Sequence, residues 1–276
     1  MGLDASVMCN CYRDGKAKPC PFPDLYYVDD DGFPAVRLDM NDAYNEEKSD
    51  EFDAWLASCC EHPYMDQSSV YLADWKGYHA FVDALKQGGE GLFSALLAAL
   101  PDENNGLIPA SIARQCLHEL ELFKQQSGVI KTFLVNTVTG SIISSRTGSE
   151  SGMFSWDGRT GMRAGFDENG FFIVDAWELN REMFRAVRMS QRQLESDELG
   201  QPDRFEYTDL DTGQQFVCGT PVRIFVKSDF GTKQEYPQQM HIEKRSVDVD
   251  YFQYILEPLS HILQVSVQTG NPVRWS

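Results

Sequence analysis

The sequence predicts an α+β protein in which a helical first half packs on an antiparallel sheet formed by the second half. Apolar residues recur at helical spacing over about residues 45–126, whereas β-branched and aromatic residues separated by frequent turn signals dominate over about 129–247. A further helical pattern over about 249–268 closes the chain. Because Ser127-Gly128 lacks the composition of a linker, we expect a single domain over residues 1–276.

The N-terminal residues predict a strand that belongs to a strand pair. Apolar residues take every second position, which is the period of a half-buried strand. These positions are Leu3, Ala5, Val7, Cys9 and Cys11. A turn at Arg13–Lys16 follows, and we expect the chain to return alongside this strand near Cys20. A second hairpin is expected from Leu25–Val28, through the turn Asp29–Gly32, into Ala35–Leu38.

Four helices are expected in the first half, because apolar residues recur at i, i+3, i+4 and i+7 and stop at Gly or Pro. They lie at about residues 49–60, 76–87, 92–100 and 109–126. Ser49 is the expected N-cap of the first, whose apolar stripe includes Cys59 and Cys60. The helices are expected to cover one face of the sheet, since such a sheet buries one face.

The second half predicts an antiparallel meander. Candidate strands lie at residues 129–135, 141–144, 153–156, 171–176, 205–209, 214–218 and 222–226. Gly-containing turns such as Thr139-Gly140 and Asn169-Gly170 separate them. In the final helix Pro258 predicts a kink, Gly270 predicts a C-cap, and Trp275 is expected to dock on the body of the protein.

Glu178–Leu199 fits two structures, because it lacks Gly and Pro but carries regularly spaced arginines. On a helix these would share a face and form a cationic stripe able to bind an anion or an acidic partner. The four residues of this stripe are Arg181, Arg185, Arg188 and Arg192. The alternative is a solvated face paired with glutamates, or a strand pair in which the arginines do not line up. We expect the alternative, because charge runs usually form solvated faces.

The composition is that of a folded and strongly acidic soluble protein. Hydrophobic residues make up 42% of the chain, and 24 Lys and Arg are outnumbered by 42 Asp and Glu, for a formal charge of −18. This charge disfavours nucleic acid and favours a basic protein partner, although acidity also serves solubility alone. With no membrane-spanning apolar run and seven cysteines at irregular spacing, we expect a cytoplasmic protein in a reducing compartment.

The cysteines of the first sixty residues allow three interpretations. The first is core packing, because free cysteine is among the most buried residue types. The second is a zinc site, although Cys-x-Cys is tighter than the usual ligand spacing. Its ligands would be Cys9, Cys11 and Cys20 together with Cys59, Cys60 or His62. The third is N-myristoylation, since Met1–Ser6 fits M-G-x-x-x-[ST], but anionic lipid would repel so acidic a chain.

The opening residues also carry the pattern M-G-x-D-x-S-x-M-C-x-C. This pattern comprises Met1, Gly2, Asp4, Ser6, Met8, Cys9 and Cys11. It resembles the start of a group of uncharacterised bacterial proteins, and the similarity extends to Phe52–Leu56 and to Pro272–Trp275. The resemblance implies a bacterial cytosolic protein, and it implies neither a function nor any site residue.

Two classes of function follow from the sequence. The five histidines form no metalloprotease or deaminase motif, and no nucleophile elbow occurs, so we expect a binding protein more than an enzyme. An acidic surface with aromatic anchors suits a module that engages a basic partner, such as an immunity-type inhibitor of a toxin. The alternative is a metal-binding protein or a cysteine-dependent enzyme that uses the N-terminal cysteines.

Overall fold

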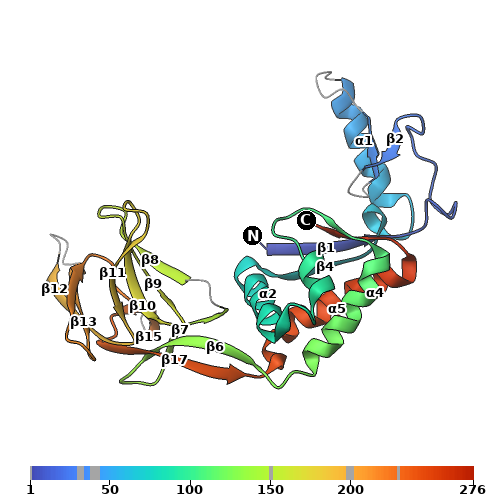
Figure 1. Cartoon of the computed structure of the whole chain (residues 1–276). Coiled ribbons are helices and arrows are strands. Elements are labelled where there is room, and N and C mark those ends of the chain that lie inside the picture. Colours follow the sequence, from blue (N-terminus) through green and yellow to red (C-terminus); the bar gives the residue numbers. More distant parts are fainter. Residues whose placement is uncertain (1, 30–33, 38–43, 149–151, 197–201, 229–230) are drawn as a thin grey trace. The chain divides into compact units, whose positions relative to one another are not determined.

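The computed structural model describes residues 2–29, 34–37, 44–148, 152–196, 202–228 and 231–276, and they form an α+β protein (Figure 1). The chain divides into two compact units. The first, the α/β unit, comprises Met1–Ser127 and Asp248–Ser276, and the second, the β unit, comprises Gly128–Val247. We expected one packed domain, but each unit has a sheet of its own.

The α/β unit contains a four-stranded antiparallel sheet in the order β4-β1-β18-β5. The strands are β1 (Gly2–Met8), β4 (Asp66–Asp74), β5 (Leu107–Ile108) and β18 (Val273–Trp275). The predicted first strand is confirmed, with Leu3, Ala5 and Val7 fully buried. Its partners are β4 and the C-terminal β18, so the expected return alongside it near Cys20 is wrong.

Five α-helices belong to the α/β unit. They are α1 (Tyr44–Ser58), α2 (Trp75–Gly89), α3 (Ser94–Ala99), α4 (Ala110–Lys124) and α5 (Gln253–Thr269). All five predicted helices are present, but α1 begins before Ser49, which lies inside the helix and is not its N-cap. α5 packs on β4 and β1, and α4 packs on α5. Helices α5 and α2 therefore pack on the sheet of their own unit.

The C-terminal end of the chain is anchored in the way the sequence predicts. Gly270 ends α5 in the left-handed conformation, at φ 74°, and donates its backbone N–H to Ser266 O. Trp275 pairs with Ala5 in β18 and is only 3% exposed. This pairing places the two ends of the described chain side by side in one sheet (Figure 1).

A small thiol-rich core lies beside the start of β1. We call it the thiol core, and it consists of Cys9, Cys11, Cys20, Phe52, Trp55, Cys59 and Met65. The hairpin of β2 (Tyr26–Val28) and β3 (Pro34–Val36) packs on it through Tyr26 and Val36, next to α1 (Figure 1). This hairpin is as predicted, although residues 30–32 of its expected turn lie outside the described residues.

The β unit is built from two larger antiparallel sheets and a hairpin. The sheets have the orders β11-β10-β9-β8 and β14-β13-β12-β17-β6-β7, and the hairpin is β15-β16. The strands of the first sheet are β8 (Gly152–Trp156), β9 (Met162–Asp167), β10 (Gly170–Asp175) and β11 (Arg181–Ala186). Those of the second are β6 (Val129–Asn136), β7 (Ile142–Thr147), β12 (Arg188–Ser196), β13 (Pro202–Asp209), β14 (Gln215–Cys218) and β17 (Gln239–Val247). The hairpin strands are β15 (Ile224–Ser228) and β16 (Gly231–Glu235).

The core of the β unit lies between its two sheets. Phe171 and Phe184 come from the first sheet, Tyr207 and Met240 come from the second, and all four are fully buried. The sheets thus cover one another, which is why this unit needs no helix. All seven predicted strands are present, whereas β9, β16 and β17 were not predicted.

The segment Glu178–Leu199 resolves in favour of strands, and the helical interpretation is wrong. β11 and β12 occupy its described part, up to Ser196, so the four arginines lie on two strands and not on one helix face. Each has a carboxylate within 3.1 Å: Arg181 with Glu178, Arg185 with Asp167, Arg188 with Asp211 and Arg192 with Glu206. The local charge is compensated, so the geometry supports no cationic stripe. Among the described helices, none has the length and apolar character needed to cross a membrane.

Candidate metal centre

Two short segments, 51 residues apart in the chain, bring four ligand-type side chains together. Cys9 and Cys11 follow the end of β1, and Cys60 and His62 follow the end of α1. Their ligand atoms, three thiol sulfurs and one imidazole nitrogen, all lie within 4.8 Å of one another. We call these four residues the quartet.

The first segment is held by the C-terminal end of α5. Between the two cysteines, the Asn10 side chain donates to Thr269 O at 2.8 Å. Asn271 donates to Met8 O at 2.7 Å and to Asn10 Oδ1 at 2.8 Å. These side-chain hydrogen bonds fix the backbone on both sides of Cys9. The thiols are therefore in position before a metal binds.

The second segment is held by backbone hydrogen bonds and a strained turn. Cys59 O accepts from Lys18 N at 2.7 Å, and Met65 O accepts from Cys9 N at 2.6 Å. In the turn that follows His62, Tyr64 and Met65 have φ values of 56° and 58°. For a non-glycine residue this left-handed conformation costs about 1–3 kcal/mol, and residues that adopt it concentrate at functional sites. The strain lies where the chain turns back from His62 toward β4.

The distances within the quartet suit tetrahedral coordination. Cys9 Sγ lies 3.7 Å from Cys60 Sγ, and Cys11 Sγ lies 3.3 Å from His62 Nδ1. Sulfurs at two corners of a tetrahedron around Zn²⁺, each about 2.3 Å from the metal, are about 3.8 Å apart. Van der Waals packing accounts for one sulfur–sulfur contact. It does not account for three sulfurs and an imidazole nitrogen that all lie within 4.8 Å of one another.

Burial favours the protonated thiols of Cys9 and Cys11 in the metal-free protein, because it raises the pKa of both. Cys9 is 3% exposed and Cys11 is 7% exposed, whereas Cys60 and His62 are half-buried. Desolvation raises the pKa of Cys9 to about 12, and it also raises the pKa of Cys11. A bound cation reverses this preference, because a coordinating thiol loses its proton. Metal binding at the quartet therefore releases protons.

The donor set identifies the metal that fits. Three thiolates and one imidazole form a Cys₃His set, which is common in structural zinc sites and is too soft for magnesium or calcium. The set provides four ligands, so it fills a tetrahedron and leaves no position for a substrate or a water.

The structure separates the predicted ligands. Cys9, Cys11, Cys60 and His62 are brought together, whereas Cys20 and Cys59 lie outside the quartet and belong to the thiol core, where the Cys59 thiol also interacts with that of Cys60. Core packing therefore describes part of the cysteine set. A sequence signal for the quartet was present but unused, since Cys60-Glu61-His62 repeats the one-residue spacing of Cys9-Asn10-Cys11.

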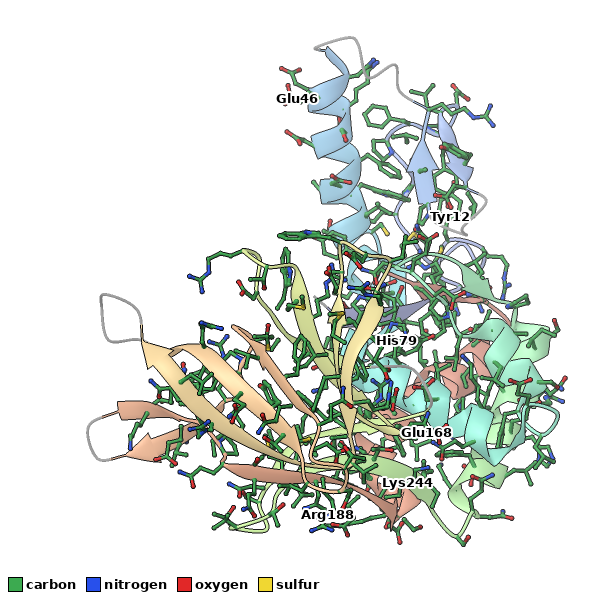
Figure 2. The ribbon with its side chains drawn as sticks, turned by 60° about the vertical axis from the view of Figure 1, so that its left-hand side comes forward. Tyr12, Glu46, His79, Glu168, Arg188 and Lys244 are labelled. Atoms are coloured by element: carbon green, nitrogen blue, oxygen red, sulfur yellow. The ribbon has the colours of Figure 1, made fainter. Side chains whose placement is uncertain are left out.

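A small cavity of about 210 Å³ adjoins the quartet. Cys9 forms part of its wall, together with Met8, Tyr12, Tyr26 and Met65. Figure 2 shows Tyr12 on the segment that follows β1. The wall is mostly apolar, so the cavity admits small uncharged molecules to the side of Cys9.

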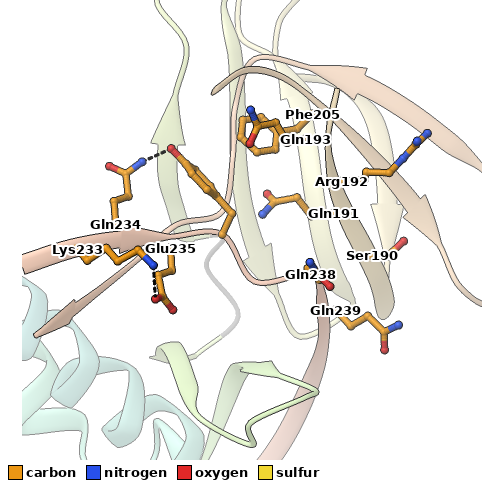
Figure 3. A pocket seen from close by; sticks show the side chains of 11 residues that line it. Ser190, Gln191, Arg192, Gln193, Phe205, Lys233, Gln234, Glu235, Gln238 and Gln239 are labelled. Atoms are coloured by element: carbon orange, nitrogen blue, oxygen red, sulfur yellow. Dashed lines mark hydrogen bonds and ion pairs between the residues drawn. The ribbon is translucent and has the colours of Figure 1, made fainter. Parts of the chain in front are cut away.

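A second cavity, of about 780 Å³, lies in the β unit between β12 and β16 (Figure 3). Five amide side chains line it: Gln191, Gln193, Gln234, Gln238 and Gln239. Lys233 pairs with Glu235 there, and Arg192 points away toward its partner Glu206. Amides bind polar groups but do not transfer protons at neutral pH, so the five glutamine side chains support hydrogen bonding to a polar molecule.

Comparison of the chain with protein-family models, with curated proteins and with solved structures yields no match. The resemblance of the opening residues to a bacterial group stays a prediction. The functional argument rests on the geometry of the quartet.

Proposed function

We propose that the protein binds one zinc ion through Cys9, Cys11, Cys60 and His62, and that this centre has a structural role. The observation that carries the proposal is the convergence of the four ligand atoms within 4.8 Å. A bound ion joins the end of β1 to the end of α1, and so stabilises the thiol core between them.

A structural role suits the site better than a catalytic one. A catalytic zinc site keeps a position open for water or substrate, whereas this set supplies four protein ligands. The thiol core is also small, and small cores commonly depend on a metal for stability.

A cysteine-dependent enzyme is the competing use of the same residues. The 3.3 Å contact between Cys11 Sγ and His62 Nδ1 has the spacing of a nucleophile and its base. An activated cysteine, however, requires a lowered pKa and access, while burial raises the pKa of Cys11 and leaves it 7% exposed. The zinc proposal uses all four converging groups, whereas the dyad uses two.

The test is the metal content of the purified chain and of two variants, measured by mass spectrometry. We expect one zinc per chain in the wild type and a large loss of zinc in Cys60→Ser. Cys20→Ser is the matched control, because Cys20 is as buried as Cys11 and lies in the same core but outside the quartet. Wild-type protein without zinc that also fails to take it up would overturn the proposal, and so would equal zinc loss in both variants.

A second candidate function, the engagement of a basic protein, is favoured by the surface of α1. The helix carries five exposed carboxylates: Glu46, Glu47, Asp50, Glu51 and Asp53. Glu46 projects outward from the helix in Figure 2. Carboxylates at i, i+4 and i+7 share one helix face, and such a face attracts cationic partners over a distance set by the ionic strength. The zinc centre would then fix the end of the helix that presents them.

A further inference from the structure

We propose that Cys9 and Cys60 are an oxidation site, at which a peroxide converts the two thiols into a disulfide and thereby expels the metal. The inference rests on the proposed zinc centre and adds a regulation to it. It assigns a distinct chemical role to two of the four ligands.

The quartet contains a sulfur–sulfur contact and a sulfur–nitrogen contact, and the Cys11 thiol also interacts with the thiols of Cys9 and Cys60. Cys9 Sγ and Cys60 Sγ are 3.7 Å apart, which is van der Waals contact, and a disulfide requires about 2.05 Å. Cys11 Sγ instead contacts His62 Nδ1 at 3.3 Å. The imidazole nitrogen forms no lasting bond with an oxidised sulfur. We therefore assign the disulfide to Cys9 and Cys60, whose sulfur atoms are in direct contact.

Cys60 is the member that a small oxidant reaches first, because Cys9 is only 3% exposed. The 210 Å³ cavity has Cys9 in its wall, and Cys60 is half-buried at the surface. By contrast, Cys116 and Cys218 are buried, and no second thiol is among the groups that act on either of them. These two cysteines are internal controls, because oxidation there has no neighbouring thiol to resolve it.

The chemistry balances with hydrogen peroxide as the two-electron oxidant. One sulfur attacks the peroxide, so that an S–O bond forms, the O–O bond breaks and hydroxide leaves. The second sulfur then attacks the resulting sulfenic acid, the S–S bond forms, and the S–O bond breaks with loss of a second hydroxide. Two thiolates, one peroxide and two protons thus give one disulfide and two waters.

The consequence for the centre follows from the ligand count. Disulfide formation removes two of four ligands, and Cys11 and His62 alone do not complete a zinc site. The disulfide continues to join the end of β1 to the end of α1. Oxidation therefore replaces the zinc cross-link by a disulfide cross-link and releases the zinc ion.

The experiment uses the full chain, with its zinc content measured before treatment. Hydrogen peroxide is added in steps, released zinc is followed with a chromogenic chelator, and disulfides are mapped by peptide mass spectrometry. We expect one zinc released for each Cys9–Cys60 disulfide formed, with reversal by dithiothreitol and added zinc. Cys218→Ser is the matched control and should release zinc exactly as the wild type does.

Two outcomes would overturn this inference while leaving the zinc centre intact. One is retention of zinc at peroxide doses that oxidise the half-buried Met162 and Met183. The other is zinc release with a disulfide that involves Cys11 or joins Cys59 to Cys60. Starting protein that neither contains nor takes up zinc would instead overturn the proposed function, and the metal measurement made before oxidation tells these failures apart.

Discussion

The core of the β unit and the thiol core show two ways of holding a fold together. The β-unit core contains thirteen buried residues from two facing sheets, and it includes five aromatic rings. The thiol core contains seven, of which four are cysteines. Since burial of apolar area provides most of the stability of a fold, we expect the first core to contribute more stability than the second.

The comparison relates the role of the cysteines in each core to the apolar area buried around them. In the β unit, Cys218 lies among aromatic side chains, where burial raises its pKa to about 11, and it acts as a small apolar residue. In the thiol core the cysteines come with a histidine and with converging backbone segments. The zinc ion that we propose there would add a cross-link between these segments.

The largest effect expected is the response to a chelator. Removal of zinc should expose the backbone amides of residues 9–29 and 44–65 to solvent while leaving the β unit protected, because only the first region depends on the metal. Hydrogen–deuterium exchange of the full chain, with and without the chelator, measures both regions in one sample. Equal protection of residues 9–29 in both samples would contradict the dependence of the thiol core on zinc.

The next effect concerns the β-unit core alone. The Tyr207 hydroxyl lies 2.7 Å from both Gln191 Oε1 and Thr220 O and accepts the Val222 N–H at 3.1 Å, in full burial. Tyr207→Phe leaves buried polar groups unsatisfied and should lower the free energy of unfolding by about 1–3 kcal/mol, without any change in zinc content. Urea unfolding and metal analysis measure the two quantities. Tyr71→Phe, on an exposed ring, is the control and should change stability by less than about 0.5 kcal/mol.

A pH experiment distinguishes the metal-free from the loaded thiol core. The pKa of Cys9 in the folded, metal-free protein is about 12, above its ordinary value of 9.0, so folding favours the protonated thiol. The metal-free protein should therefore lose stability as the pH rises from about 9 to about 12. In the loaded protein the thiols are already deprotonated, so this loss should be absent, and acid should release the metal instead. The difference in Tm between the two forms across this range is the measurement, and identical profiles would contradict it.

The smallest effect is electrostatic and compares the surfaces of the two units. Neutralising the five carboxylates of α1 should weaken retention on immobilised polylysine at low salt, because these groups are exposed. The control neutralises five carboxylates of the β unit that already pair with Lys or Arg, and should weaken retention less. Its positions are Glu168, Glu178, Glu182, Asp211 and Glu235. Equal weakening of retention in both variants would show that retention depends on the net charge of the protein and not on the surface of α1.

Local patterns of the sequence determined the fold class, the five helices, the first strand and the cap at Gly270. These features depend on residues that are close together in the sequence, so their spacing predicts them. The segment from Glu178 to Ser196 was ambiguous for the opposite reason. Its strands pair with the adjacent β10 and β13 and with the distant β17, and these pairings decide for strands where the spacing within the segment also allows a helix.

Only the tertiary structure decided that the chain divides into two units and that four ligands meet. The sequence contains Cys-x-Cys and Cys-x-His, but 48 residues separate Cys11 from Cys60, and chain spacing says nothing of the distance between the sulfur atoms. The Cys9–Met65 backbone hydrogen bond joins the two segments, and the Asn10 and Asn271 amides hold the first of them against the end of α5. Cys20 packs in the thiol core but is not among the four residues whose ligand atoms lie within 4.8 Å of one another.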